Sequence, residues 1–375
     1  MATLQDAHLV LFFTRGISLK TWDHIGLLDR EVALYEAMRP CLGKITFVTY
    51  GDARDLRYAD RVNGIRIVCN RWRLPQQLYV KLLSRLYPRH WKGCVVLKSN
   101  QVQGADIALQ VARRFRNKFV ARCGYLHSDV IEHRHGSNSD QARRARALEK
   151  KVFDGADRVV VTTPVMRERV LQRYRLPEER VVVIPNYVDT EVFRPGSDRY
   201  RLPKRICYVG RLGEEKNLFG LLEAVKGLEV ELVIVGGGPL SIKLRKEAAL
   251  HKLPVRLMGN VPNRKLPEIL NSAALFILPS YYEGHPKALL EAMACGLPVI
   301  GTDVSGIREL ISHRETGYLC GTSSEEIRQA IQEVLSDLQL RTRMGRNARD
   351  FIINNFTLER VSKMELALLE ELLKE

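Results

Sequence analysis

The sequence predicts an α/β protein built from two parallel-sheet domains. Short runs rich in β-branched residues alternate with helix-like stretches along the chain, which is the pattern of repeated βαβ units. This alternation is interrupted once, by a Pro-, Gly- and Arg-bearing stretch over residues 193–203, and it restarts at Arg205. A chain of 375 residues is also too long for one ordinary hydrophobic core and suits two domains of about 150–200 residues each.

The first half of the chain contains seven strand-like runs with helical stretches between them. The strands are expected at residues 8–13, 44–50, 64–69, 94–98, 118–122, 158–162 and 181–185, and the helices at about 26–39, 76–87, 104–115, 141–153 and 164–174. A second α/β series runs to about Leu338, and two last helices, at about 341–354 and 358–374, have no strand after them. The predicted organisation is a first domain over 1–190, a linker over 191–203, a second domain over 204–354 and a final segment over 355–375.

Composition and cysteine usage indicate a globular protein of a reducing compartment. No stretch approaches the roughly 18–20 uninterrupted apolar residues of a membrane span. The apolar run 8–13 follows Asp6 without a basic segment before it, so we expect a first strand and not a secretion signal. The seven cysteines are scattered and never form a Cys-x-x-Cys pair, which predicts reduced thiols in a cytoplasmic protein, without disulfides or structural zinc.

Positive charge is concentrated in the first half. Residues 1–190 contain 33 Lys and Arg against 19 Asp and Glu, which accounts for +14 of the net +16. Segment 70–92 is basic and aromatic with leucines at helical spacing, and such a helix can lie on an anionic membrane. The alternative is a domain-surface helix whose Leu, Tyr and Trp side chains pack inward, and for the leucines we favour it. Nucleic-acid binding is another use of such charge, but no signature of a nucleic-acid-binding fold accompanies it.

Two glutamates eight positions apart flank the start of a predicted helix. The apolar run 274–280 predicts a buried strand, a Gly and a Pro then open the helix, and residues 288–295 continue it. Glu283 is expected in the loop at the carboxyl end of the strand, where α/β sheets bind ligands, and Glu291 about two turns inside the helix. The helix start suits a phosphate, so the two carboxylates can accept hydrogen bonds from hydroxyls on either side of a diphosphate. The alternative is two ordinary glutamates, one in an exposed loop and one on a solvated helix face.

The segments around this pair resemble one enzyme family. They read ICYVGRLGEEKN (206–217), ELVIVGGGPL (231–240), CGLPVIGTDVSGIRELI (295–311) and IPNYVDTEVFRP (184–195). Together with residues 283–291 they resemble the nucleotide-sugar-binding half of retaining glycosyltransferases with the GT-B fold, group 1 or family 4. The resemblance is dense over about 180–312 and looser over 1–180. It implies two Rossmann-like domains with a cleft between them, the acceptor in 1–190, the nucleotide sugar in 204–354, and a C-terminal helix over 355–375 that packs back on the N-terminal domain.

The resemblance also implies roles for individual residues. Arg211 and Lys216 would bind the diphosphate, Glu283 the donor sugar and Glu291 the ribose, while His127 would line the sugar from the opposite domain. Further donor-binding residues are expected at Gly16, Gly210, Gly237, Gly238, Gly284, His285, Pro286, Lys287, Ala288 and Leu289. We take His127, Arg211, Lys216 and Glu283 as the catalytic set.

Each of these residues has a plainer interpretation. An Arg and a Lys after a strand can be a solvated pair, the glycines of 236–238 can form an ordinary turn, and a lone histidine is usually structural; Asp129 is a weaker alternative to His127. His133 and His135 are expected in a polar loop over 132–140, and no third ligand at fitting spacing suggests a metal. An Asp-x-Asp motif is also absent, and no metal site is predicted.

The chain departs from the family pattern at three positions. The loop after the first strand has the single glycine Gly16 where a Gly-Gly pair is usual, and Arg15 beside it could add positive charge. Asn217 and Tyr187 stand where glycine is common. The first departure bears on the N-terminal part of the site and on the family's usual acceptor geometry.

The sequence therefore predicts a retaining, metal-independent glycosyltransferase without a cofactor. The expected donor is a nucleotide sugar, a UDP-sugar in preference to a GDP-sugar, and the expected acceptor is a lipid-linked or anionic saccharide of cell-envelope polysaccharide or glycolipid synthesis. This places the protein in the cytoplasm, at the inner face of the cell membrane, with peripheral association and no nucleic acid. The alternatives are transfer to a small soluble acceptor such as a sugar phosphate, a nucleotide-sugar epimerase on the same fold, and a non-catalytic carbohydrate- or nucleic-acid-binding protein.

Overall fold

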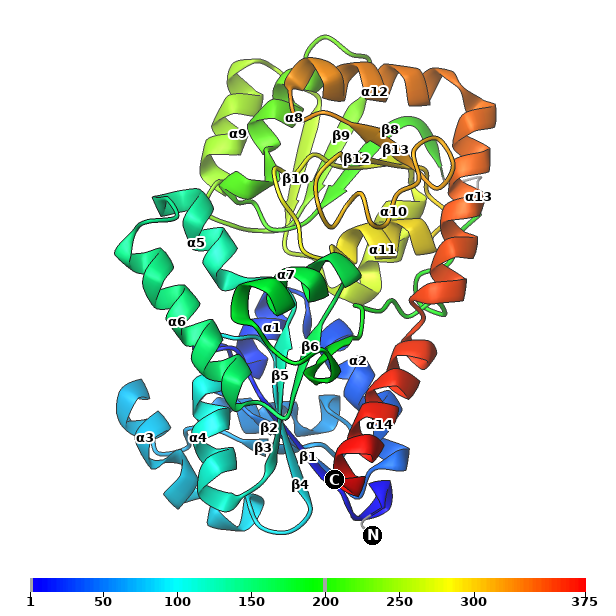
Figure 1. Cartoon of the computed structure of the whole chain (residues 1–375). Coiled ribbons are helices and arrows are strands. Elements are labelled where there is room, and N and C mark those ends of the chain that lie inside the picture. The colour runs from blue at the N-terminus through cyan, green and yellow to red at the C-terminus, as the bar shows by residue number, and fades with distance from the viewer. Residues whose placement is uncertain (1–2, 198–200) are drawn as a thin grey trace. The chain divides into compact units, whose positions relative to one another are not determined.

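The computed structural model describes residues 3–197 and 201–375, and the chain divides into two compact units (Figure 1). The first unit comprises Met1–Asp23, Glu31–Pro185 and Glu359–Glu375, and the second comprises His24–Arg30 and Asn186–Leu358. A short segment of the first half, His24–Arg30, therefore belongs by its contacts to the second unit. Residues 198–200 of the predicted linker lie outside the described residues.

The first unit contains a seven-stranded parallel sheet in the order β3-β2-β1-β4-β5-β6-β7. The strands are β1 His8–Phe12, β2 Lys44–Val48, β3 Arg66–Val68, β4 Val95–Ser99, β5 Lys118–Cys123, β6 Arg158–Val161 and β7 Val181–Val183. β1 and β4 are buried at every position, as expected for central strands with helices on both faces of the sheet. The strand order reverses between these two strands, so the loops that follow them flank a topological switch point.

Helices connect these strands. They are α1 Leu19–His24, α2 Leu28–Met38, α3 Gln76–Leu86, α4 Ala105–Phe115, α5 His127–His135, α6 Asp140–Gly155 and α7 Pro164–Tyr174. Two of these helices, α1 and α5, were not predicted. The second half of α5 overlaps the stretch 132–140, which was expected to be a loop.

The C-terminal helix α14, Leu358–Lys374, returns to the first unit from the end of the chain (Figure 1). Its apolar face buries Val361, Leu368, Leu369 and Leu372. Glu365 on this helix pairs with Lys98 of β4 at 2.5 Å, and the two side chains are only 3 % and 1 % exposed. Arg158 of β6 binds Glu371 at 2.5 Å near the helix end. The predicted return of the last helix to the N-terminal domain is confirmed.

The second unit contains a six-stranded parallel sheet in the order β10-β9-β8-β11-β12-β13. The strands are β8 Leu202–Val209, β9 Glu231–Val235, β10 Val255–Gly259, β11 Ala273–Leu278, β12 Val299–Thr302 and β13 Tyr318–Cys320. The helices are α8 Leu218–Val225, α9 Ser241–Leu250, α10 Leu266–Asn271, α11 Lys287–Ala294, α12 Ser324–Ser336 and α13 Leu338–Asn355. The two parallel sheets confirm the predicted fold class. No helix in the described chain is both long and apolar enough to pass through a bilayer.

Candidate functional site

The predicted donor residues gather at the switch point of the second sheet. Its strand order reverses between β8 and β11, and ligands in such sheets bind in the crevice beyond the carboxyl ends of the two strands. The loop after β8 carries Gly210, Arg211 and Lys216, and the loop after β11 carries Glu283. A hydrogen bond from Tyr281 N to Glu215 O, 2.9 Å long, joins the two loops.

Lys216 and Glu283 are in direct contact. Lys216 Nζ donates to Glu283 Oε1 at 2.6 Å, and Ser280 Oγ donates to the same oxygen at 2.7 Å. The Lys216 and Glu283 side chains are 16 % and 10 % exposed, so both charges lie largely out of water. A cation and a carboxylate are thereby held together at the rim of the switch point. Ser280 was not predicted, although its place at the end of the strand run could have indicated it.

Two further residues of the loop after β8, Asn217 and Arg211, are held by hydrogen bonds. Asn217 has a left-handed backbone, with φ of 52°, which accounts for the glycine that is common at this position and which asparagine tolerates. Its side chain donates to Thr322 O at 2.8 Å and is buried. Arg211 is exposed, and the buried Tyr208 fixes its backbone by a hydrogen bond from Oη to Arg211 O at 2.9 Å.

The glycines bring two backbone segments together beside this loop. Gly236 has φ of +130°, and a Cβ there would lie 2.0 Å from Gly210 O. A Cβ on Gly238 would lie 2.5 Å from Leu212 O, and one on Gly237 would lie 2.8 Å from the Asn260 side chain. Larger residues would therefore push these backbones apart.

The predicted donor-binding residues 284–289 lie at the start of helix α11. Pro286 precedes the helix, Lys287 begins it, and Ala288 and Leu289 continue it. His285 is buried and turned toward the chain after β7: Asn186 Nδ2 donates to His285 O at 2.6 Å, and Asn186 N donates to its Nδ1 at 3.3 Å. This contact is structural and was not predicted. The backbone of Glu283 and Gly284 packs against Gly306, where a Cβ would lie 2.2 Å from Gly284 O.

Glu291 is buried, so the interpretation of a solvated helix face is wrong. It is the fifth residue of α11, little more than one turn inside the helix, and its side chain is 2 % exposed. Its Oε1 accepts hydrogen bonds from Asn263 Nδ2 at 2.8 Å and from Arg30 Nη1 at 3.2 Å. Its Oε2 is buried and lacks a hydrogen-bond partner among the described residues. A buried carboxylate oxygen without a partner is costly, and a hydroxyl donor would satisfy it.

Sequence reasoning missed both partners of Glu291. Asn263 lies 28 residues before it, in the turn after β10, and Arg30 lies 261 residues before it, at the start of α2. Neither distance along the chain follows a periodic pattern. Only the fold brings these residues to one carboxylate.

In the first unit, Gly16 lies in the loop after β1, at that sheet's switch point. It has φ of +82°, and the nearest atom to a Cβ there is Gln76 Nε2 at 3.8 Å, so the position needs glycine for its backbone and not for space. Arg15 makes two 2.8 Å contacts to the carboxylate of Asp106 in the first turn of α4. The positive charge expected from Arg15 is therefore balanced by an acidic partner.

His127 is the first residue of α5 and is half-buried. Gln103 Nε2, from the loop after β4, contacts the imidazole at 2.9 Å to Nε2 and 3.3 Å to Nδ1. Burial lowers the pKa of His127, an effect that the nearby Glu149 carboxylate opposes. The burial therefore favours the neutral imidazole over the imidazolium.

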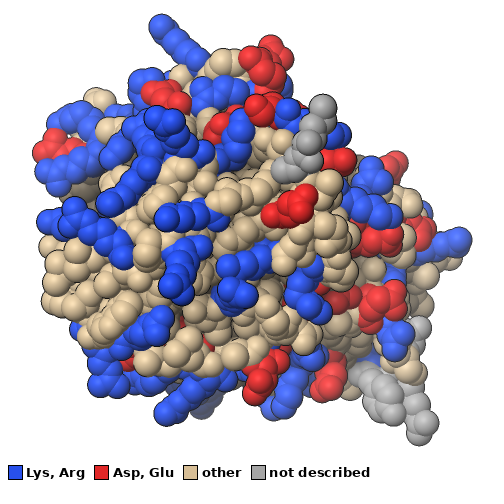
Figure 2. All heavy atoms as spheres, turned by 90° about the horizontal axis from the view of Figure 1, so that it is seen from below, with Lys and Arg blue, Asp and Glu red and all other residues tan. Residues whose placement is uncertain are grey.

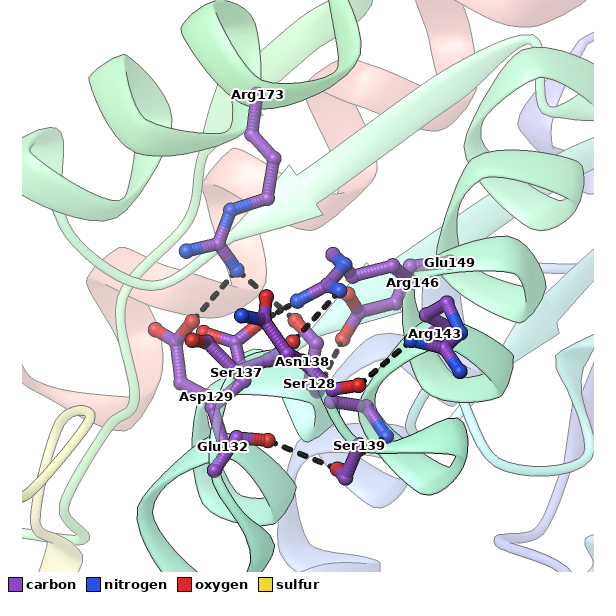
Figure 3. Close-up of polar contacts among 12 residues, drawn as sticks. Ser128, Asp129, Glu132, Ser137, Asn138, Ser139, Arg143, Arg146, Glu149 and Arg173 are labelled. Atoms are coloured by element: carbon purple, nitrogen blue, oxygen red, sulfur yellow. Dashed lines mark hydrogen bonds and ion pairs between the residues drawn. The ribbon is translucent and has the colours of Figure 1, made fainter.

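A polar network holds the first turn of α5 (Figure 3). Glu149 of α6 is fully buried, and its Oε1 accepts a hydrogen bond from Ser128 N at 2.9 Å while its other oxygen accepts one from Tyr174. Arg173 of α7 binds Ser128 Oγ at 2.9 Å and Asp129 Oδ1 at 2.6 Å. A carboxylate at a helix N-terminus stabilises its unpaired N–H groups. The network therefore fixes the backbone that carries His127.

The other polar candidates of this region have structural partners. Asp129 is paired with Arg169 at 2.7 Å as well as with Arg173, so it is an ion-pair centre. The prediction of a loop over 132–140 is wrong for its first part, because His133 and His135 lie in the last turn of α5. Within residues 3–197 and 201–375, no group of three or more His, Cys, Asp or Glu side chains is placed to hold a metal ion.

Comparisons with known proteins identify both halves of the chain. The model of the group 1 glycosyl transferases matches residues 189–351, and the model of glycosyltransferase family 4 matches residues 34–192. The α-maltose-1-phosphate synthase of Mycolicibacterium smegmatis is 29 % identical over 248 residues, which cover 58 % of this chain and 64 % of that protein. The match thus spans less than two thirds of that relative's length.

Two solved structures share the fold over nearly the whole chain. Sucrose-phosphate synthase from Thermosynechococcus elongatus has a TM-score of 0.80 at 21 % identity, covering 98 % of this chain and 99 % of that one. Anabaena HepE in complex with UDP and glucose has a TM-score of 0.78 at 16 % identity, covering 97 % and 99 %. The two family models match adjoining parts of the chain, and the two solved structures have the same fold. The chain belongs to the retaining GT-B glycosyltransferases of group 1, family 4.

Proposed function

We propose that this protein transfers a sugar from a nucleoside diphosphate sugar to a hydroxyl of an anionic acceptor, with retention of the anomeric configuration. The observation that carries the proposal is the pair of carboxylates on either side of the α11 entry. Glu283 is paired with Lys216 at the switch point, and Glu291 keeps one buried oxygen without a partner among the described residues. A ligand with a diphosphate between two hydroxyl-bearing groups fits this arrangement.

Each residue has a role that follows from its chemistry. Arg211 and Lys216 bind the diphosphate, Glu283 accepts a hydrogen bond from the donor sugar, and Glu291 accepts one from the ribose. The bond between the anomeric carbon and the phosphate oxygen breaks as the acceptor oxygen bonds to that carbon on the same face. The leaving phosphate takes the acceptor's proton. Negative charge grows on that phosphate in the transition state, and cations aimed at it lower the barrier.

The proposed donor is a UDP-sugar. This proposal is supported by HepE, a protein with the same fold whose structure has been solved with UDP and with UDP-glucose. Thermal-shift measurements with UDP, GDP and ADP test this base preference, because a ligand that binds only the folded protein raises its melting temperature.

Transfer is tested with Lys216→Ala and Glu283→Ala, each expected to lower kcat by about 100-fold or more because each removes a group beside the reacting centre. Lys226→Ala, which removes an exposed lysine of the same unit, is the matched control and should retain wild-type turnover. Product should appear only with an acceptor present, whereas an epimerase would change the donor sugar without one. Wild-type turnover in either site variant would refute the assigned roles.

Support for an anionic, membrane-associated acceptor comes from the region of α3. Tyr79, Leu83, Tyr87 and Trp91 pack inward, as expected for the apolar residues of a surface helix. Trp72 and Leu78, by contrast, are 47 % and 42 % exposed. The exposed cations of the same segment are Arg71, Arg73, Lys81, Arg85, Arg89 and Lys92, and residues 70–92 contain no Asp or Glu.

Lys and Arg side chains are also prominent across much of the face shown in Figure 2, where they lie among other residues and some Asp and Glu. Basic side chains beside exposed Trp and Leu suit the headgroup region of an anionic bilayer. Each Lys or Arg near such a surface contributes about 1 kcal/mol, so a few give reversible, salt-sensitive binding. We therefore propose that the reaction occurs at a membrane face, on a lipid-linked precursor of cell-envelope polysaccharide or glycolipid.

Vesicle co-sedimentation tests this placement. The protein should bind vesicles rich in phosphatidylserine and not phosphatidylcholine alone, and Lys81→Glu with Arg85→Glu should weaken binding by about 30-fold or more. Lys243→Glu with Lys246→Glu, which changes the charge equally on exposed positions of α9, should have little effect. Equal losses in the two variants, or no binding at low salt, would contradict the membrane placement.

A second candidate acceptor is a small soluble sugar phosphate. The names of the α-maltose-1-phosphate and sucrose-phosphate synthases, which are similar to this chain in sequence and in fold respectively, favour it. The same basic charge would then raise the local concentration of the anionic acceptor. Transfer to glucose 1-phosphate or glucose 6-phosphate without vesicle binding would select this candidate.

A further inference from the structure

We propose that Arg30 positions the Glu291 carboxylate so that one of its oxygens stays open to a ribose hydroxyl, which makes Arg30 a determinant of selectivity for ribonucleotides. This inference rests on the proposed function, in which Glu291 contacts the ribose. Arg30 lies between β1 and β2, far along the chain from the segments of the second half that resemble the glycosyltransferase family.

The segment that carries Arg30 packs closely against the rest of the second unit. Gly26 has φ of +77°, and a Cβ there would lie 2.2 Å from Val261 O, so only glycine allows this approach. Gly26 O accepts a hydrogen bond from Asn263 N at 2.9 Å, and the Asn260 side chain reaches His24 O at 3.4 Å. The backbone of residues 24–30 is therefore aligned with the turn after β10.

That alignment brings two donors to the same oxygen of Glu291. Asn263 contributes a neutral amide at 2.8 Å and Arg30 a guanidinium at 3.2 Å, and the Arg30 side chain is only 16 % exposed. Since both bind Oε1, the carboxylate is held in one orientation and Oε2 is left without a partner among the described residues. Hydrogen bonds to a charged acceptor in a dry site are stronger than those between neutral groups, so Oε2 is a strong acceptor for a hydroxyl.

Arg30 therefore has two effects on this acceptor. It supplies the positive charge next to a carboxylate that is 2 % exposed, and it restricts rotation of the carboxylate. Without Arg30, Glu291 can turn so that its oxygens share the single Asn263 donor, and its hydrogen bond to a ligand hydroxyl weakens. The loss should fall on ligands with a ribose hydroxyl and spare ligands without one.

The test is a binding cycle with UDP, 2′-deoxy-UDP and 3′-deoxy-UDP, measured by isothermal titration calorimetry. Wild type, Arg30→Met, Glu291→Gln and the double variant are compared, with melting temperatures recorded for each. Arg30→Met should weaken UDP binding by about tenfold, which corresponds to the loss of one charge-assisted hydrogen bond. It should have a much smaller effect on the deoxy analogue that lacks the hydroxyl contacted by Glu291. In the Glu291→Gln background, Arg30→Met should change UDP affinity by less than about twofold.

Two further variants separate positioning from general structure. Arg30→Lys keeps the charge and should restore part of the selectivity. Arg264→Met removes a cation that is 72 % exposed and contacts Asp29 of the same segment at 3.5 Å, and it should keep wild-type selectivity. Equal weakening of all three ligands by Arg30→Met, or the same loss with and without the Glu291 carboxylate, would overturn the inference.

Failure of the proposed function gives a different result. Wild type would then bind none of UDP, GDP and ADP, or Glu291→Gln would leave the selectivity between UDP and both deoxy analogues unchanged. If wild type and Glu291→Gln behave as proposed and only the Arg30 variants do not, the role of Arg30 alone is refuted.

Discussion

Replacing Lys98 by methionine should destabilise the first unit by about 3–5 kcal/mol, the usual cost of removing one partner from a buried ion pair. Lys98 and Glu365 are 1 % and 3 % exposed, and their 2.5 Å contact joins a central strand to the returning helix α14. Burial lowers the pKa of Lys98, and the Glu365 carboxylate opposes that shift. Methionine keeps most of the side-chain volume of lysine. The lost stability therefore measures the cost of leaving the buried Glu365 carboxylate unpaired and not the cost of a cavity.

The structure makes this loss measurable in one unit. All three tryptophans, at positions 22, 72 and 91, lie in the first unit, so tryptophan fluorescence during urea unfolding follows that unit alone. A loss of 3–5 kcal/mol corresponds to a fall of about 6–20 °C in its melting temperature, at about 2–4 °C per kcal/mol for a unit of this size. Lys363→Met, which breaks an exposed pair with Glu359 on the same helix, should cost less than about 1 kcal/mol.

The double variant Lys98→Met with Glu365→Leu distinguishes charge from packing. Two apolar side chains leave no buried charge, so most of the lost stability should return, and the double variant can exceed the wild type. The reasoning would be refuted by a Lys98→Met variant within about 1 kcal/mol of wild type, or by a double variant no more stable than the single one.

Two further predictions concern a buried histidine and a glycine. Burial lowers the pKa of His8 from 6.5 to about 3. The neutral His8 side chain therefore contributes fully to the stability of the folded protein above about pH 6.5. This stability is lost as the pH falls toward about 3, by up to about 1.4 kcal/mol per pH unit. His8→Gln should therefore lose stability less steeply between pH 6.5 and pH 4 in urea titrations, and parallel curves would contradict this. Gly236→Ala, whose Cβ would meet Gly210 O, should cost about 1–3 kcal/mol and weaken UDP binding. Gly227→Ala, at a glycine that also has a positive φ (+75°) but has open space around its Cβ position, should leave UDP binding unchanged. Equal effects on UDP affinity would show that the contact with Gly210 is not the cause.

The strand pattern and the family resemblance were enough to predict the two parallel sheets. Buried strands such as β1 and β11 are short, mostly apolar and bounded by polar loops, so their sequence pattern identifies them without tertiary information. α5 was missed because its residues 127–135 are mostly polar and have no apolar stripe. Its first turn depends on Glu149 and Arg173, which come from other helices.

For the candidate site, the sequence indicated which loops carry it but not how the side chains pair. Glu283 and Glu291 were predicted as a pair, yet each has partners distant in the sequence. Lys216 is 67 residues from Glu283, and Arg30 is 261 residues from Glu291. Such pairs follow from strand order and not from local propensity, so one sequence without its fold cannot reveal them. The roles assigned to these residues stay predictions.

The contact between Lys98 and Glu365 also has a consequence for synthesis of the chain. The two residues are 267 positions apart, so Glu365 is made long after the strand that carries Lys98. At about 5–20 residues per second, the ribosome needs roughly 13–53 seconds to reach it. During that interval Lys98 has no counter-charge, because the helix that supplies Glu365 has not yet been made. The first half of the chain can therefore reach its final stability only after the second half has been translated and α14 has returned.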